Sequence, residues 1–207
     1  MGTFEYDGFG GPFGYQHGIV FGNSSLLTDG TYNFSDLGFE TIYLNGYYGL
    51  DPEISINRIG DINGDGFDDV SIVQTYSNTI QVLFGAVDLA SQGSVDLEKD
   101  LNGSVGFTID FSLDSPYHFN PFNVSWAGDL NGDGYLDLLV GTQFEADPYS
   151  SDYYGFYDPW RPVFVIFGGS EIGSSGTIYL DQLNGTDGFA IQSSAPIGNS
   201  RDFLQFL

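Results

Sequence analysis

The chain reads Asp61-Ile62-Asn63-Gly64-Asp65-Gly66-Phe67-Asp68-Asp69 at one point and Asp129-Leu130-Asn131-Gly132-Asp133-Gly134-Tyr135-Leu136-Asp137 at another, each time between two apolar runs. Ca²⁺ binds about six to eight oxygen atoms, which carboxylates and amide carbonyls at alternate positions supply when the chain curls around the ion. The glycine at the sixth position permits that curl, because glycine takes positive φ without a Cβ clash. Each nonapeptide therefore predicts a calcium site, and their recurrence indicates a repeat.

Two other interpretations of the nonapeptide are open. Asn-Gly and Asp-Gly are favoured pairs in any β-hairpin, so a bare turn without metal is one alternative. A bare turn, however, does not require acids at the first, fifth and ninth positions. The other alternative is an EF-hand or dockerin loop, which needs a carboxylate at the twelfth position and a following helix. Those positions are Ile72 and Val140, which favours a β-type loop. Asp68 falls outside the alternation, and we expect a solvated acid there.

The repeat extends beyond the two loops. Their first aspartates stand at positions 61 and 129, which gives a unit of 68 residues, a size that suits a four-stranded propeller blade with long loops. An apolar segment that ends in Phe-Gly occurs three times, at residues 19–22, 82–85 and 165–168. A Gly-Phe segment also occurs three times, at residues 38–42, 106–110 and 188–192. The order in each unit is strand, loop, strand, Phe-Gly strand, long loop and Gly-Phe strand.

This order predicts four antiparallel strands per unit. In the first full unit we expect strands at residues 53–60, 69–74, 79–84 and 106–111, and in the second at residues 122–128, 137–142, 161–167 and 188–193. Residues 15–22 and 38–43 supply the third and fourth strands of an earlier unit. Residues 202–207 stand where another first strand is expected. A phenylalanine at the end of each third strand is predicted to pack between blades, and the glycine after it to let the chain turn.

Together these motifs resemble the FG-GAP repeat of the integrin α-subunit β-propeller, which is also found in bacterial surface proteins. The resemblance covers about residues 15 to 207, although the Gly-Ala-Pro part of the family pattern is degenerate here. It implies an all-β fold of four-stranded blades and a structural role for calcium. It also implies metal ligands in both loops. These are the side chains of Asp61, Asn63, Asp65 and Asp69 with the backbone carbonyl of Phe67, and the side chains of Asp129, Asn131, Asp133 and Asp137 with the carbonyl of Tyr135.

The family's closed propellers have about seven blades, whereas this chain has two complete repeats, so we expect an incomplete segment of a larger propeller. Residues 1–207 form one such segment. The expected division is a partial blade at residues 1–50, blades with calcium loops at residues 51–115 and 116–195, and the start of another blade at residues 196–207. Neighbouring blades of a longer chain, or a second copy of this chain, are the partners that this division requires.

Composition agrees with an extracellular all-β domain. The 207 residues include 30 glycines, with 41% hydrophobic and 17% aromatic residues, and four Lys and Arg stand against 28 Asp and Glu. The formal charge of −24 disfavours nucleic acid and anionic membranes as partners and favours cations. No cysteine is present, which excludes thiolate sites and disulfides. No run of residues is long enough to insert into a membrane, and no signal peptide is visible at the start.

The second repeat is 15 residues longer than the first between its loop and its Phe-Gly dipeptide. The extra residues lie between Gln143 and Arg161 and are rich in rings and acids. In an antiparallel blade this connection lies on the face opposite the calcium loops, together with residues 45–48 and 115–119. Such an aromatic face is a candidate surface for a protein or glycan ligand. The alternative is that the rings cover the blade tops as core.

Together with these observations, the resemblance to FG-GAP repeats implies a calcium-binding adhesion or recognition module at the cell surface or outside the cell. The alternative is the propeller part of a secreted calcium-dependent polysaccharide lyase or hydrolase. No catalytic motif supports an enzyme, because His17 and His118 are the only histidines and neither a Gly-x-Ser-x-Gly elbow nor a phosphate loop occurs. The cations are also few, namely Arg58, Lys99, Arg161 and Arg201.

Overall fold

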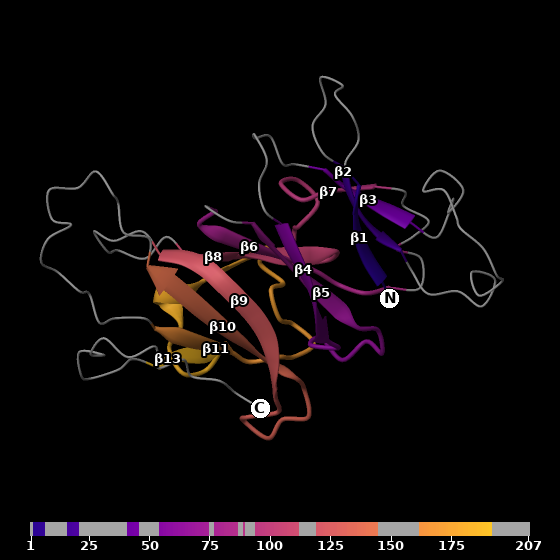
Figure 1. The fold of residues 1–207 in the computed structure, drawn as a ribbon. Coiled ribbons are helices and arrows are strands. Elements are labelled where there is room, and N and C mark those ends of the chain that lie inside the picture. Colours follow the sequence, from indigo (N-terminus) through magenta and orange to yellow (C-terminus); the bar gives the residue numbers. More distant parts are fainter. Residues whose placement is uncertain are drawn as a thin grey trace, which may run out of the picture.

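The part of the chain that the structure describes is all-β and forms three sheets that lie side by side (Figure 1). This computed structural model describes residues 2–6, 16–20, 41–45, 54–74, 77–86, 89, 94–111, 119–144 and 162–191. Within these ranges no helix is long and apolar enough to cross a membrane. Residues 46–48, 115–118, 145–161 and 202–207, on which several sequence predictions rest, lie outside the described residues.

Apart from β7 and β12, the strands of the three sheets follow the order of the chain. The first sheet contains β1 (Gly2–Tyr6), β2 (Gln16–Val20), β3 (Thr41–Asn45) and β7 (Ser94–Asp96). The middle sheet contains β4 (Ile54–Gly60), β5 (Asp69–Gln74), β6 (Thr79–Leu83), β8 (Gly106–Asp110) and β12 (Thr177–Tyr179). The third sheet contains β9 (Phe119–Gly128), β10 (Asp137–Phe144), β11 (Val163–Ile166) and β13 (Gly188–Ile191). A 3-10 turn, Leu180–Gln182, follows β12.

The two full units have the same antiparallel topology. In the middle sheet β4 pairs with β5, β5 with β6, and β6 with β8, and in the third sheet β9 pairs with β10, β10 with β11, and β11 with β13. The eight strands predicted for the two units are thereby confirmed, with ends that differ by a few residues. Both first pairs shift register beside the acidic loop, at Arg58/Gly60 and at Asp137/Leu138.

Three strands were not predicted. β1 pairs with β2 and so adds a strand to the first sheet, where sequence analysis expected only two strands before residue 53. β7 and β12 are three-residue strands in the connections between third and fourth strands. Each pairs in parallel with the fourth strand of the preceding sheet, β7 with β3 and β12 with β8. Each unit therefore supplies a strand to the sheet before it.

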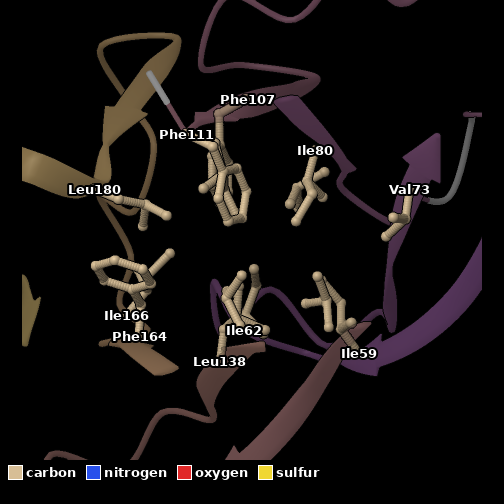
Figure 2. Close-up of a cluster of buried hydrophobic side chains, with 14 of the residues drawn as sticks. Ile59, Ile62, Val73, Ile80, Phe107, Phe111, Leu138, Phe164, Ile166 and Leu180 are labelled. Carbon is tan, nitrogen blue, oxygen red and sulfur yellow. The ribbon is translucent and has the colours of Figure 1, made fainter. Parts of the chain in front are cut away.

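Apolar side chains fill both faces of the middle sheet. On the side of the third sheet, Ile59, Ile62, Ile80 and Phe107 are fully buried together with Leu138. Figure 2 shows these side chains pointing toward one another across the space between the sheets. On the other side, a second cluster is made of Val70, Ile72, Leu83, Leu89, Val95, Leu97 and Leu101.

The phenylalanines at the ends of the third strands differ in burial. Phe84 is buried, and its ring lies 5.6 Å from that of Phe107, as expected for a residue between blades. Phe167 is half-buried and packs edge-on against Phe189 at 5.8 Å. Within the third strand of the second unit, Phe164, Val165 and Ile166 are all buried, so this strand is covered on both faces.

Candidate metal centre

Each acidic nonapeptide forms the hairpin loop between the first and second strands of its unit. The first loop (residues 61–69) joins β4 to β5, and the second loop (residues 129–137) joins β9 to β10. Glycines at the fourth and sixth positions have positive φ: Gly64 has φ 76° and Gly66 has φ 93°. The chain therefore curls at both positions, as the glycine pattern predicts.

In the first loop, Asp61 organises the backbone. Its Oδ1 accepts hydrogen bonds from the N–H groups of Gly64 at 2.8 Å and Asp65 at 3.0 Å, and its Oδ2 accepts one from Gly66 at 2.9 Å. Asn63 Oδ1 also accepts from the N–H of Asp65, at 3.0 Å. Asp65 Oδ1 in turn accepts from the N–H of Phe67 at 2.8 Å. Four of the five predicted ligand residues are thus connected within one turn of chain.

The second loop repeats this network. Asp129 accepts from Gly132 at 2.7 Å, Asp133 at 3.0 Å and Gly134 at 2.9 Å. Asn131 Oδ1 accepts from the N–H of Asp133 at 3.0 Å, and Asp133 Oδ1 accepts from the N–H of Tyr135 at 2.9 Å. The same donors meet the same acceptors at nearly the same distances, so the two nonapeptides form one loop type.

The ninth-position aspartates are fully buried at the start of the second strands. Asp69 Oδ2 accepts from the N–H of Ile62 at 2.9 Å, and its Oδ1 accepts from the N–H of Gly85 at 2.8 Å. Asp137 has the matching pair: Leu130 donates at 2.6 Å and Gly168 at 3.0 Å. Each aspartate therefore joins its loop to the Phe-Gly end of the third strand.

The ionised form of the Asp69 carboxylate is electrostatically unfavourable in the folded chain, and a nearby cation would stabilise it. Burial raises its pKa to about 7, although the N–H groups of Gly85 and Ile62 act against that rise. The negative charges of Asp65 and Asp61 raise it further. Three of the predicted ligands are thus close enough to repel one another. A positive charge among them would favour the ionised form of Asp69.

The donor set fits calcium in chemistry. Each loop offers three carboxylates and one amide oxygen, and no nitrogen or sulfur ligand, which is the set that Ca²⁺ prefers. In the described residues no group of three or more acidic, histidine or cysteine side chains forms a ready-made metal cage. The carboxylate oxygens instead hold backbone N–H groups. An ionised carboxylate has about four acceptor positions, and Asp69 uses two of them, so capacity for an ion remains.

Asp68 has a side chain that is 39% exposed, in agreement with its prediction as a solvated acid, and it also has a partner. It forms an ion pair and hydrogen bond with Arg58, which lies on β4. Arg58 is the equivalent of Trp126 in the second unit, where Leu136 replaces Asp68. The pair is therefore particular to the first unit. Both side chains are substantially exposed, so the pair contributes little to stability.

The glycines of the Phe-Gly dipeptides are site residues that sequence analysis interpreted only as turns. Neither Gly85 nor Gly168 has positive φ. A Cβ added at Gly85 would lie 2.4 Å from the carbonyl oxygen of Asp68, and one at Gly168 would lie 2.2 Å from that of Leu136. Glycine is required because the acidic loop packs directly against its backbone. The recurrence of Phe-Gly was the signal that could have indicated this role.

Comparison with known proteins agrees with these repeats. A family model for the FG-GAP repeat matches residues 123–155, which include most of β9, the second loop and β10. The chain therefore contains a segment that matches the FG-GAP repeat. It also resembles an integrin α subunit: integrin alpha-E of Mus musculus is 35% identical over 114 residues, a match that covers 50% of this chain. The chain spans 9% of the length of that integrin. No solved structure matches the chain.

The described sheets are consistent with part of an FG-GAP propeller. The first, middle and third sheets have a strand order consistent with successive blades, and the chain resembles part of an integrin α chain.

Proposed function

We propose that this FG-GAP module is a calcium-stabilised recognition or adhesion module that acts at the cell surface or outside the cell. The observation that carries the proposal is the pair of equivalent loops, in which three carboxylates and an asparagine amide gather at the first hairpin of two successive units. The raised pKa of Asp69, to about 7, supports a cation among them. The likeness to an integrin α chain supports the location and the class of activity.

Calcium would be held in each loop by residues of one repeat. In the first loop these are the side chains of Asp61, Asn63, Asp65 and Asp69 and the carbonyl of Phe67, and in the second Asp129, Asn131, Asp133 and Asp137 and the carbonyl of Tyr135. When bound, the ion supplies positive charge that offsets the repulsion among these carboxylates. The chain itself does the positioning, because Asp61 fixes the turn and Asp69 ties it to Gly85.

The ligand surface is proposed at residues 143–161, opposite the calcium loops. Most of this stretch lies outside the described residues, so the proposal rests on its sequence, which is rich in aromatic and acidic residues. Aromatic side chains are enriched at protein-binding surfaces because they bury a large area with few rotatable bonds. The role of the module is then to present this loop on a scaffold that calcium makes rigid.

The proposal is tested by measuring binding of the chain to an array of extracellular matrix proteins and glycans, in calcium and in EDTA. A matched variant lacks residues 146–159. We expect binding that requires calcium and is lost in the deletion variant, whose melting temperature keeps its calcium dependence. Unchanged binding after the deletion would show that the binding surface lies elsewhere on the chain. Cleavage of an acidic polysaccharide by the chain would replace the recognition function with the enzymatic alternative.

A further inference from the structure

The two acidic loops are connected by a path of three hydrogen bonds and the peptide bond between Gly168 and Gly169. In the first loop, Ile62 donates its N–H to Asp69 and accepts, through its carbonyl oxygen, the N–H of Gly169 at 2.9 Å. The neighbouring residue Gly168 donates its N–H to Asp137, the ninth residue of the second loop. The path from Asp69 to Asp137 therefore passes through the backbone of three residues, and the two aspartate side chains accept hydrogen bonds at its ends.

Close packing reinforces this connection. A Cβ at Gly168 would lie 2.2 Å from the carbonyl oxygen of Leu136 in the second loop and 2.8 Å from that of Ile62 in the first, so Gly168 is wedged between both loops. The second loop also packs on the first. A Cβ at Gly64 would lie 2.4 Å from the ring of Tyr135, and one at Gly60 would lie 2.6 Å from Leu136 Cδ1.

We propose that the two loops bind calcium as a positively coupled pair, and that Gly168 and Gly169 are the positioning residues that couple them. This inference rests on the proposed calcium binding. An ion that orders the second loop fixes Asp137 and, through it, the turn at Gly168. That turn holds Ile62, whose N–H holds Asp69. The first loop is then partly ordered before it binds its own ion. The ion that enters this loop therefore binds more tightly than it would if the other loop were empty.

The sign of the coupling separates this link from simple electrostatics. Each bound Ca²⁺ makes the chain less negative and so weakens its attraction for the next ion. Electrostatics alone therefore predicts that the first ion lowers the affinity for the second. The link through Gly168 and Gly169 predicts the opposite. Positive coupling observed at physiological salt, where exposed charges are screened over about 8 Å, would come from the link.

The experiment is a calcium titration by isothermal calorimetry of the whole chain and of variants with one loop inactivated. In Asp61→Ala the remaining second loop should bind calcium at least about fivefold more weakly than it does in the intact chain with the first loop filled. Asp129→Ala should weaken the first loop by the same factor, because coupling is reciprocal. Equal affinities, or a tighter remaining loop, would overturn the proposal.

Gly168→Ala tests the path itself, and Gly85→Ala is its matched control. An added methyl at Gly85 meets Asp68 and Phe67 of the first loop alone, whereas one at Gly168 meets both loops. We expect Gly85→Ala to weaken the first loop and keep the coupling, and Gly168→Ala to abolish the coupling. If Gly168→Ala does not fold, Tyr135→Ala removes a contact between the loops while keeping the ligand carbonyl, with Phe67→Ala as its counterpart. Coupling that survives Tyr135→Ala undiminished, or is lost equally in Phe67→Ala, would contradict the path.

The result also separates this inference from the proposed function. If neither loop binds calcium at millimolar concentration, the proposed function fails. The connection is then tested in EDTA with Asp69→Asn, Asp137→Asn and the double variant, by their shifts in unfolding midpoint. Shifts that add would overturn the connection between the loops, and non-additive shifts would support it.

Discussion

Leu130 and Ile62 hold the same position in successive acidic loops, but Leu130 is 54% exposed and Ile62 is fully buried. Ile62 is covered because the third sheet packs against the first loop, with Gly169 bonded to its carbonyl and Leu138 in the same core cluster. Leu130 has no such cover among the described residues. The apolar side chains Phe189 and Ile191 on β13 are also exposed, at 39% and 38%.

These exposed apolar residues predict that the chain self-associates. Light scattering of the isolated chain should show a polydisperse assembly, and a sharp dimer would indicate strand exchange between two copies instead. Leu130→Asp combined with Phe189→Asp should reduce the association. The control is Ser170→Asp, which adds charge at an exposed polar site. A stable monomer at all concentrations would contradict the need for neighbouring blades.

Removal of calcium should lower the melting temperature. With about 5 mM calcium and dissociation constants of about 10⁻⁴ to 10⁻³ M, the ion bound in each loop stabilises the folded chain by roughly 1 to 2 kcal/mol. For a chain of this size, each kcal/mol of stabilisation raises the melting temperature by about 2–4 °C. Asp133→Ala should mimic removal at one loop. Asp68→Ala is the control, because its ion pair with Arg58 is exposed and contributes little. Calorimetric scans with the same midpoint in EDTA and in calcium would eliminate the calcium role.

Stability in EDTA should fall as the pH rises from about 4 to about 7. The reason is the pKa of Asp69, which is raised from 3.8 to about 7. Between these values the folded chain binds a proton that the unfolded chain releases, so raising the pH favours unfolding, by up to about 4 kcal/mol for this group. Calcium requires the ionised carboxylate and should flatten or reverse the slope. Chemical denaturation at several pH values measures it, and Asp69→Asn should remove this contribution.

Gly173→Ala should destabilise the packing between the first and second full units. Gly173 has φ 65°, and a Cβ there would lie 2.2 Å from the ring of Phe107, which is fully buried in the middle sheet. Gly185→Ala is the control, because Gly185 has φ 93° and no atom within 4 Å of such a Cβ. Both variants bear about 1–2 kcal/mol of backbone strain, and Gly173→Ala adds about 1–3 kcal/mol of overpacking. Equal losses in urea unfolding would show that the ring of Phe107 can move aside.

The sequence predicted the parts of this fold that depend on short-range pattern. The alternation of apolar residues located strands such as β5, and the Asp and Gly spacing located both loops. The parallel strands β7 and β12 escaped prediction because three residues carry too little periodicity, and their partners belong to another unit. Their signal was a further repeat, Gly93-Ser94-Val95-Asp96-Leu97 and Gly176-Thr177-Ile178-Tyr179-Leu180.

The residues that make up each acidic loop could be predicted from the sequence, but the contacts that join the two loops could not. Spacing alone indicated which side chains belong to each loop. It could not show that Gly168 lies between two loops, since that contact joins residues more than one repeat apart and arises only when the sheets pack. The Asp68–Arg58 pair was missed for a similar reason, because their proximity depends on the register of β4 and β5.

Because β7 and β12 each pair with the sheet that precedes them in the chain, the order of synthesis on the ribosome determines when each sheet edge is covered. β8 is the fourth strand of the middle sheet, yet its outer edge is covered by β12, which is translated only after the whole of β9, β10 and β11. A blade therefore emerges with an open edge and keeps it until most of the next repeat has been made. We expect nascent chains of this protein to pass through a series of edge-exposed intermediates, each protected by the repeat that follows it.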